Sequence, residues 1–526
     1  MINNPATLLS RRTLLQTVAT TACLGSGLLL SPVFAQSAKT SSAPSTDSEL
    51  PANAQAWRAM SRVGYGPSAT LVQTIQAARS PRDWALQQVD MAFVASQQVP
   101  NIAAELIDFN APLPRIYEGL QRERELRTID RSKLQKTEEP TQTKRMDFSE
   151  SRDPEHFSRM LAQQAAAWRL SSCSQPEQEN PLLARMTEFW FNHLNVFSGK
   201  GSVRPFTGHY VVNVARRHAL GKFEDLLLAS ARHPGMLLYL DQAQSVADGT
   251  HGPQGKARGL NENYARELME LHTLGVDGGY NQADVRELAR VLTGWTVSRD
   301  EASGFRFVPR LHDRGVKQVL GQPFPTSSTR SGMLEGEDAI RMLARHPATA
   351  KRVSLQLAQF FIADQPSAEL VQRISRSFTA TQGDMRAVMR TVLDSPEFWS
   401  PKNRLFKTPM DYACSALAAT HAAAQEQVGT EPYRRNIVLT LGFLTNAGQP
   451  LHGWQTPDGY KVDAATWLVP EALTRRADFA LGLARKSPDL DFLIPFLSPA
   501  TRDAVARENP ALRPGLMLAS PDFMYK

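Results

Sequence analysis

Residues 261–296 read NENYARELMELHTLGVDGGYNQADVRELARVLTGWT, and this stretch indicates the class of the fold. Asn261 is a residue type that commonly caps the start of a helix, and Gly275 is the type that commonly ends one in a left-handed conformation. The spacing therefore predicts a helix that runs to Leu274. The residues that follow predict a second helix over roughly 281–294, so we expect a helical hairpin.

The same helical periodicity occurs along the rest of the chain. Apolar side chains recur three or four residues apart in several stretches, while alternating runs of Val, Ile and Thr are almost absent. We therefore expect a mainly α-helical fold: a large multi-helix globular domain with long ordered loops and little or no β-sheet. The apolar positions are Leu183, Met186, Trp190, Leu194 and Phe197, then Val285, Leu288, Ala289 and Leu292, then Val353, Leu357, Phe360 and Phe361.

The composition is that of an ordinary globular protein. The 526 residues are 42% hydrophobic and 21% charged, and the 31 glycines and 34 prolines are close to average usage. These values exclude collagen-like, wholly disordered and disulfide-scaffold proteins. The formal net charge is +7 with no concentrated basic stripe, so we expect no nucleic-acid partner. The sequence also lacks Gly-x-Ser-x-Gly, His-Glu-x-x-His and Walker motifs, which leaves the common hydrolase and nucleotidase signatures without a match.

The first thirty-five residues predict export. Arg11 and Arg12 precede a mildly apolar stretch that runs to Leu30, and a small-x-small pattern that ends at Ala35 fits a signal-peptidase site. The arginine pair favours a twin-arginine signal over an ordinary secretory signal, which would make the twin-arginine export machinery a partner. We expect removal of residues 1–35 to leave a periplasmic or secreted protein with no stable membrane span after processing.

Beyond this signal, the chain divides into a linker and one large domain. Residues 36–54 are rich in Ser, Thr and Ala and predict a flexible linker, and residues 55–526 predict the helical domain. Residues 121–157 are highly charged with little apolar periodicity, so we expect an exposed excursion there. Residues 447–467 are rich in Gly, Pro and aromatic residues and predict an ordered loop. The aromatic residues expected to pack this loop are Trp454, Tyr460 and Trp467.

Two cysteines, Cys173 and Cys414, remain after the signal is removed. They could form one long-range disulfide or stay as two buried thiols, and the spacing leaves both alternatives open. Neither belongs to a Cys-x-x-Cys motif, so the pattern does not favour thiol redox chemistry or covalent haem attachment.

The first helix of the 261–296 hairpin carries the strongest candidates for chemistry. Asn263, Glu267 and Glu270 are spaced i, i+4, i+7 and fall on one helix face, where two carboxylates and an amide could bind a divalent metal or act as acid and base. The alternative is structural: both glutamates would form ion pairs with arginines of the same hairpin. Those arginines are Arg266, Arg286 and Arg290.

Two histidine positions are candidate metal ligands. His312 and Asp313 are adjacent in a polar loop, and loops carry functional residues more often than helix faces do. His193 shares an apolar helix stripe with Trp190 and Leu194, so a buried core histidine is the alternative interpretation. With Asn263 and the two glutamates, His193, His312 and Asp313 would complete a site that draws on several helices.

Further short motifs occur in order along the chain, on both sides of this hairpin. They are Arg62-Val63-Gly64-Tyr65-Gly66, Phe189-Trp190-Phe191-Asn192-His193, Ala219-Leu220-Gly221-Lys222-Phe223, Met236-Leu237-Leu238-Tyr239-Leu240-Asp241, His312-Asp313-x-Gly315-x-Lys317, Gly442, Gly448-Gln449-Pro450 and Pro457-Asp458-Gly459-Tyr460. With these motifs, roughly residues 55–526 resemble the bacterial DUF1800 family. The resemblance implies an α-helical fold, export and a functional partner of the DUF1501 type, and it implies no particular reaction.

Three positions depart from the family's pattern: Gln242, His272 and Gln356 stand where other residue types are commoner. His272 is therefore a poor catalytic candidate, although it lies two residues from Glu270.

The residues support two hypotheses of different kinds. In the first, the protein is an exported enzyme that performs metal-assisted hydrolysis, with a divalent metal activating water and a glutamate as base. In the second, it is a non-enzymatic binding or assembly protein of the periplasm or cell surface that engages a polysaccharide or the DUF1501-type partner. Trp454 and Trp467 would then stack on a sugar ring or simply pack their loop.

Overall fold

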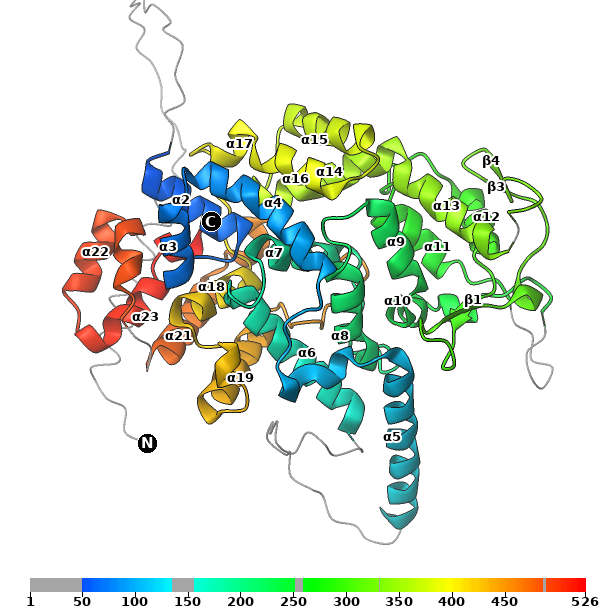
Figure 1. The fold of residues 1–526 in the computed structure, drawn as a ribbon, viewed down its shortest axis with the longest axis horizontal. Coiled ribbons are helices and arrows are strands. Elements are labelled where there is room, and N and C mark those ends of the chain that lie inside the picture. The colour runs from blue at the N-terminus through cyan, green and yellow to red at the C-terminus, as the bar shows by residue number, and fades with distance from the viewer. Residues whose placement is uncertain (1–49, 135–155, 251–258, 331, 486–488) are drawn as a thin grey trace, which may run out of the picture.

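The computed structural model describes residues 50–134, 156–250, 259–330, 332–485 and 489–526. The predicted signal peptide and most of the predicted linker lie outside these residues. The described chain is mainly α-helical, as predicted, with two small strand hairpins (Figure 1). Among the described residues, no helix is both long enough and apolar enough to cross a lipid bilayer.

The α-helices fall into three runs along the chain. The first contains α2 (Ala52–Val63), α3 (Ala69–Ala77), α4 (Pro81–Gln97), α5 (Leu113–Leu134), α6 (Phe157–Ser174), α7 (Pro181–His193) and α8 (Thr207–Tyr210). The second contains α9 (Phe223–Arg232), α10 (Pro234–Tyr239), α11 (Asn263–Glu267), α12 (Gln282–Val291), α13 (Met333–Arg345), α14 (Pro347–Phe361), α15 (Ala368–Ala380), α16 (Met385–Leu393) and α17 (Pro396–Trp399). The third contains α18 (Pro409–Thr420), α19 (Glu431–Asn446), α20 (Ala464–Trp467), α21 (Pro470–Ala484), α22 (Pro499–Ala506) and α23 (Arg513–Leu518).

Shorter helical segments connect these elements. Two are π-helical, namely η4 (Val211–Arg216) and η7 (Leu268–His272). The others are 3₁₀ turns: η1 (Ala104–Asn110), η3 (Arg204–Phe206), η5 (Gln242–Gln244), η8 (Pro309–Leu311), η9 (Gln425–Gln427), η10 (Asp491–Phe496), η11 (Pro510–Leu512) and η12 (Asp522–Met524).

Helix α7 lies in the middle of the molecule and packs against α2, α4, α6 and η4 (Figure 1). Its start follows from sequence: the Asn180 side chain accepts a hydrogen bond from the N–H of Leu183, and Pro181 occupies the first turn. Almost every side chain of α7 is buried, because neighbouring elements cover the helix on all sides.

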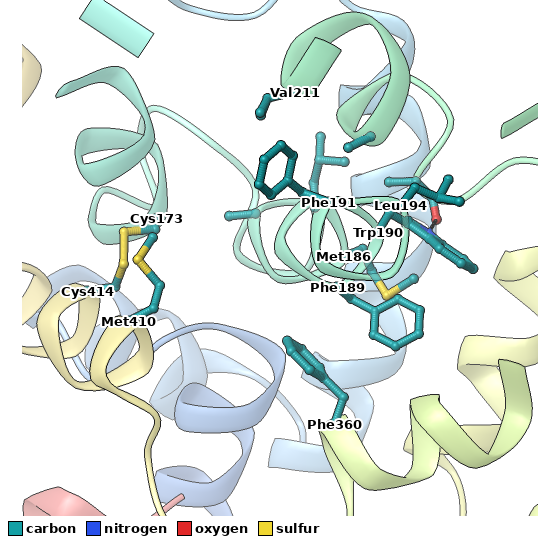
Figure 2. Close-up of a cluster of buried hydrophobic side chains, with 14 of the residues drawn as sticks. Cys173, Met186, Phe189, Trp190, Phe191, Leu194, Val211, Phe360, Met410 and Cys414 are labelled. Carbon is teal, nitrogen blue, oxygen red and sulfur yellow. Dashed lines mark hydrogen bonds between the residues drawn. A yellow bond between two sulfur atoms is a disulfide. The ribbon is translucent and has the colours of Figure 1, made fainter. Parts of the chain in front are cut away.

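Aromatic side chains of α7 reach into the core on different sides of the helix (Figure 2). Phe189 meets Phe360 of α14 with ring centres 5.4 Å apart, and Phe191 points toward Val211 of η4. The apolar positions that periodicity predicted are buried here and in α12 and α14, whereas Phe197 lies beyond the end of α7 and is only half-buried.

The ends of the described chain meet on one side of the molecule, where α2 and α3 lie near α22 and α23 (Figure 1). The Trp57 ring of α2 lies 6.0 Å from the Phe523 ring, and Phe406 and Tyr525 form an isolated antiparallel bridge. The N-terminal and C-terminal helices therefore share one hydrophobic core.

The strands form two antiparallel hairpins between α12 and α13. Strand β1 (Trp295–Val297) pairs with β2 (Phe305–Phe307), and β3 (Lys317–Val319) pairs with β4 (Gln322–Phe324). Each strand has three residues, so the prediction of little or no β-sheet is confirmed.

The hairpin of residues 261–296 forms with a different first helix from the one predicted. Asn261 precedes the helix, and its side chain accepts from the N–H of Asn263 at 2.9 Å, while Glu262 at the N-cap position makes no capping hydrogen bond with its side chain. The α-helical turns of α11 then give way to the π-helix η7. The helical run ends at His272, two residues earlier than predicted. Gly275 is left-handed with a φ of 88°, as predicted. Asn281 caps α12 through a reciprocal capping box with Asp284.

Cys173 of α6 and Cys414 of α18 form a disulfide that joins residues 241 positions apart (Figure 2). Both cysteines are buried, at 7% and 0% exposure. The structure thereby decides between the two alternatives that the spacing left open.

The charged 121–157 segment begins as helix rather than as irregular chain. Helix α5 continues to Leu134 and projects from the body of the molecule (Figure 1). Most side chains of 121–129 are exposed, but Glu123 is buried and accepts hydrogen bonds from the main chain and hydroxyl of Ser158. Residues 135–155 of the predicted excursion lie outside the described residues.

Candidate functional site

His193 is the last residue of α7 and is only 6% exposed. Its Nε2 lies 3.0 Å from the carbonyl oxygen of His272. A carbonyl oxygen only accepts hydrogen bonds, so Nε2 carries the proton of the neutral ring and Nδ1 is an acceptor. This Nδ1 is buried and has no hydrogen-bond partner among the described residues.

The imidazole rings of His193 and His272 are both neutral at neutral pH. Burial lowers the pKa of His193 to about 4, and the nearby positive charge of Arg352 adds to the effect. Burial also lowers the pKa of His272 to about 3, with smaller contributions from His193 and Arg352. The rings lie 6.3 Å apart, so a proton on either would be a buried charge beside another imidazole.

The His272 carbonyl comes from η7, the π-helical end of the first helix. The hydroxyl of Thr273 donates to the Leu268 carbonyl at 2.6 Å, and the N–H of Gly275 bonds the Met269 carbonyl at 3.2 Å. These bonds close a wider turn than an α-helix allows. π-Helical turns occur frequently at functional sites.

The 447–467 loop lies against the end of α7, where asparagine side chains bind its main chain. Asn192 accepts from the N–H of Tyr460 at 2.8 Å and donates to its carbonyl oxygen at 3.0 Å. Asn195 donates to the carbonyl oxygens of Trp454 and Thr456 at 3.1 and 2.8 Å. Tyr239 donates to the Gln455 carbonyl at 2.7 Å. The loop is therefore ordered, as predicted.

Gly459 allows this close approach. Its φ is 70°, which side-chain-bearing residues rarely adopt, and a Cβ at this position would lie 2.3 Å from the carbonyl oxygen of Asn192. The Tyr460 hydroxyl donates to the carboxylate of Glu188, which also pairs with Arg169. The Asp458–Tyr460 turn is thus fixed at both its main chain and its side chain.

A cavity of about 380 Å³ opens between α7, α14 and this loop. Its wall combines aromatic rings, amides and carboxylates. Three buried polar atoms of its lining have no hydrogen-bond partner within the described chain: Nδ1 of His193, Oε1 of Gln356 and Oδ1 of Asp364. Gln356 lies close enough to His193 to raise its pKa slightly, although no well-formed hydrogen bond joins them. All three atoms are acceptors.

The acidic residues of this cavity are held by backbone and hydroxyl groups. Asp364 uses Oδ2 to accept from the N–H of Ala464 at 2.9 Å, which leaves Oδ1 free of any donor from the described residues. Asp463 caps the start of α20, and Asp458 accepts from the Thr456 hydroxyl. These contacts fix the carboxylates without neutralising them.

The predicted carboxylate Glu267 lies close enough to Glu270 and to Asp458 of the cavity loop for their charges to act on it. Burial raises the pKa of Glu267, and the charges of Glu270 and Asp458 raise it further, against the opposing charge of Arg266. Glu270 accepts from the Tyr280 hydroxyl at 3.5 Å.

The third residue of this predicted set lies one helical turn before Glu267. Asn263 donates to the Leu240 carbonyl at 3.2 Å and is exposed. The structure therefore brings the two glutamates together beside the cavity loop, while Asn263 serves the start of α11. The catalytic roles expected for the three residues stay predictions.

The proposed ion pairs between these glutamates and the arginines of the hairpin are wrong. Within the described residues, neither Glu267 nor Glu270 forms an ion pair with Arg266, Arg286 or Arg290, because each arginine reaches a nearer acid. Their partners are Glu262 for Arg266 at 3.2 Å, Asp248 for Arg286 at 3.2 Å, and Glu287 and Asp313 for Arg290, both at 2.8 Å.

His312 and Asp313 form a separate, structural cluster beside β3 and α13. His312 is 7% exposed, with Nδ1 2.9 Å from the Thr293 carbonyl and Nε2 3.3 Å from the Glu335 carboxylate. Lys317, which is also buried, lies 2.7 Å from the same carboxylate.

The negative charge of Asp313 is balanced by Arg290 within this cluster. The Arg290 guanidinium lowers the pKa of Asp313 through hydrogen bonds and charge, although burial acts in the opposite direction. The His-Asp-x-Gly-x-Lys motif therefore anchors the strand hairpins to their neighbouring helices. Helix α12 and strand β3 lie well away from α7 in Figure 1.

The six residues expected to form one site, three as catalytic groups and three as metal ligands, fall into three places. His193 lies in the cavity, the glutamates and Asn263 lie on the α11–η7 helix, and His312 and Asp313 lie beside β3. In the part of the chain that the structure describes, no three His, Cys, Asp or Glu side chains are placed to hold one metal ion. The donor set predicted for a divalent metal does not fit.

Two cavity residues, Gln356 and Asp364, were missed as site residues. Gln356 showed only as a departure from the family pattern, and Asp364 stands in an ordinary Ala-Asp-Gln turn after α14. The tryptophans of the loop also differ from a sugar-stacking platform. Trp467 is 6% exposed and donates to the Lys461 carbonyl, and Trp454 is half-buried beside Tyr460. They pack the loop.

Comparison with known proteins identifies a family for this chain but no individual relative. The family model described as "Protein of unknown function (DUF1800)" matches residues 58–525, almost the whole described chain. No curated protein and no solved structure matches.

Proposed function

We propose that this chain, which belongs to the DUF1800 family, is an exported protein that binds a hydroxyl-rich small molecule, such as a sugar unit of a cell-envelope polysaccharide, in the cavity between α7, α14 and the 447–467 loop. The observation that carries the proposal is the set of three acceptors in the cavity wall that find no donor among the described residues. They are Nδ1 of His193, Oε1 of Gln356 and Oδ1 of Asp364.

A buried acceptor without a donor is costly, at about 1–3 kcal/mol each. Water can supply donors, but three acceptors in one cavity of about 380 Å³ also suit a ligand that carries several hydroxyl groups. Phe189 and Tyr460 line the same cavity and supply apolar surface for the ring carbons of a sugar.

Binding is a better-supported function than metal-assisted hydrolysis, because the predicted donors occupy three separate places. Recognition of a ligand in the cavity requires no metal. The acceptors can bind the hydroxyl groups of the ligand, and the aromatic rings can pack against its carbon atoms. The proposal therefore follows the second of the two sequence hypotheses, with the cavity rather than Trp454 and Trp467 as the contact.

Export is proposed on two grounds. Residues 1–35 have the pattern of a twin-arginine signal, and a disulfide between Cys173 and Cys414 is typical of proteins that reside in an oxidising compartment such as the periplasm. The DUF1501-type partner implied by the family resemblance belongs to the same proposal: a polysaccharide-binding protein and its partner would act together at the cell envelope.

Isothermal titration of the protein without residues 1–35 against soluble oligosaccharides tests this function. Gln356→Leu removes one acceptor and should weaken binding about two- to tenfold, the range expected for one hydrogen bond. Gln372→Leu, on the exposed face of the neighbouring helix α15, is the matched control and should bind as the unmodified protein does. Equal binding by both variants, or no binding of any oligosaccharide, would overturn the proposal.

A further inference from the structure

The charges that line the cavity are mostly negative. Asp364, Asp458 and Asp463 contribute carboxylates, and Lys461 contributes a positive charge from an exposed position. Within the described residues, none of these three aspartates forms an ion pair with an arginine or lysine; their contacts are with backbone N–H groups and hydroxyls. The cavity thus holds carboxylates that are positioned by the fold and that no cation of the described chain neutralises.

We infer that the ligand of this cavity carries a protonated amino group, as an unacetylated amino sugar does. This inference rests on the proposed function and specifies its ligand. An ammonium group offers three donors and a positive charge, which matches this wall of acceptors and carboxylates better than hydroxyl groups alone do.

The buried side chain that points to a ligand independently of the acidic residues is His193. It is 6% exposed, its Nδ1 faces no donor of the described residues, and its Nε2–H is committed to the His272 carbonyl. Because burial and Arg352 hold its pKa at about 4, the ring stays neutral and accepts a donor instead of repelling a cation.

Arg352 adds a positive charge to that of Lys461, and this charge acts on His193. The Nε of Arg352 donates to the Leu271 carbonyl at 2.9 Å, and Glu270 lies close enough to act on the pKa of Arg352. Glu267 lies near both Glu270 and Asp458, so these three carboxylates add negative charge close to one another. The local excess of carboxylates contrasts with the chain as a whole, whose net charge of +7 would weakly repel a cation. Selectivity for an amine would therefore come from the cavity.

Titration with matched oligosaccharides separates the amine from the sugar. The probes are a glucosamine tetramer, its N-acetylated form and a cellulose tetramer, at about pH 6, where a sugar amine is largely protonated. Spermidine serves as a linear amine without a sugar ring. We expect the glucosamine tetramer to bind at least about tenfold more tightly than either neutral tetramer, with an advantage that shrinks as salt is raised.

Asp364→Asn keeps an oxygen to accept from Ala464 and removes the charge. Because the amide nitrogen replaces the acceptor Oδ1, neutral sugars should bind about two- to tenfold more weakly, as expected for Gln356→Leu. The glucosamine tetramer should lose about tenfold more than that, so that its preference over the neutral tetramers falls about tenfold. Asp503→Asn, on an exposed position of α22, changes the net charge equally and should leave the preference intact.

Each result decides one of the two proposals. Equal affinity for the amino and neutral tetramers would overturn the inference and leave the sugar-binding function in place. Binding of spermidine alone, or of no probe, would overturn the sugar-binding function itself. Loss of the amine preference in Asp503→Asn as strong as in Asp364→Asn would assign it to overall charge and overturn the inference.

Discussion

Nε2 of His193 donates to the carbonyl oxygen of His272 across 3.0 Å, and their imidazole rings lie 6.3 Å apart. This contact ties the end of α7 to the π-helical end of the 263–272 helix. It also fixes the tautomer of His193, so that Nδ1 faces the cavity as an acceptor. Protonation of either ring would place a positive charge in the protein interior, which is unfavourable.

Acid should therefore destabilise the protein between about pH 6.5 and pH 3. Burial lowers the pKa values of His193 and His209 to about 4, and those of His272 and His452 to about 3, from an ordinary value of 6.5. As the pH falls below 6.5, the unfolded chain binds protons that the folded chain does not, so the free energy of unfolding falls. His193 alone accounts for about 3 kcal/mol of this loss.

Urea denaturation at several pH values measures this slope. His193→Asn should flatten it by about one proton, because the variant removes a group that the unfolded chain protonates and the folded chain does not. An unchanged slope in His193→Asn would show that this imidazole is not held neutral by the fold.

Gly459→Ala should destabilise the protein by about 1–3 kcal/mol, because the new Cβ would meet the carbonyl oxygen of Asn192 at 2.3 Å in a left-handed conformation. Gly442→Ala is the matched control. Gly442 lies inside α19, and beyond the helix's own backbone no described atom comes within 4 Å of the place that a Cβ would take, so the change should stabilise by about 0.5–1 kcal/mol. Chemical denaturation of both variants checks the opposite signs, and a neutral Gly459→Ala would contradict the close contact.

The helices were predictable wherever a single stripe of apolar residues decides them. Val285, Leu288, Ala289 and Leu292 are all fully buried, and Asn281 caps their helix as its residue type indicates. The switch to a π-helix at Leu268 was not predictable, because one wider turn leaves no periodic signal in the sequence.

The candidate site was predictable only in part. The helix face of Glu267 and Glu270 follows from local spacing, but the pairing of His193 with Gln356 and Asp364 depends on contacts more than 160 residues apart in sequence. His312 and Asp313 have the residue types of a metal site, yet their loop folds onto Arg290 and Glu335, which are ordinary helix residues in the sequence. At these positions, contacts with residues distant in sequence determine whether the side chains are free to bind a ligand or are held in structural ion pairs.

Glu335→Gln should destabilise the protein by about 3–5 kcal/mol. The carboxylate is 1% exposed and lies 2.7 Å from Nζ of Lys317, whose side chain is fully buried, so the variant would leave a buried ammonium without its counter-charge. Glu301→Gln, which breaks an exposed pair with Arg306, should change stability by less than about 0.5 kcal/mol. A similarly small loss in both would mean that the buried cluster is not the anchor of the strand hairpins.

Glu267→Gln should stabilise the protein at neutral pH. Burial and the charges of Glu270 and Asp458 raise the pKa of Glu267 in the folded state, so the carboxyl favours stability when protonated and loses that contribution as the pH rises through its folded pKa. Glutamine resembles the protonated form at every pH. The melting temperature of the variant should therefore exceed that of the unmodified protein at about pH 7, and the difference should vanish near pH 4.

Glu262→Gln provides the matched control on the same helix. Glu262 pairs with Arg266 at 3.2 Å, so its loss should lower the melting temperature slightly instead of raising it. Equal decreases in both variants would show that Glu267 is a stabilising carboxylate, against the repulsion inferred from its neighbours.

Replacing both Cys173 and Cys414 by alanine should lower the free energy of unfolding by about 5 kcal/mol, because a cross-link between residues 241 positions apart removes much of the freedom of the unfolded chain. A reductant should produce a comparable loss in the unmodified protein and none in the double variant, which separates the cross-link from the small cavities left by alanine. Mass spectrometry of protein isolated from the periplasm, before and after reduction, identifies the linked peptides. Free thiols at both positions in that material would remove the disulfide as a ground for proposing export, whereas a full cross-link that forms only after the chain leaves the cytoplasm would strengthen it.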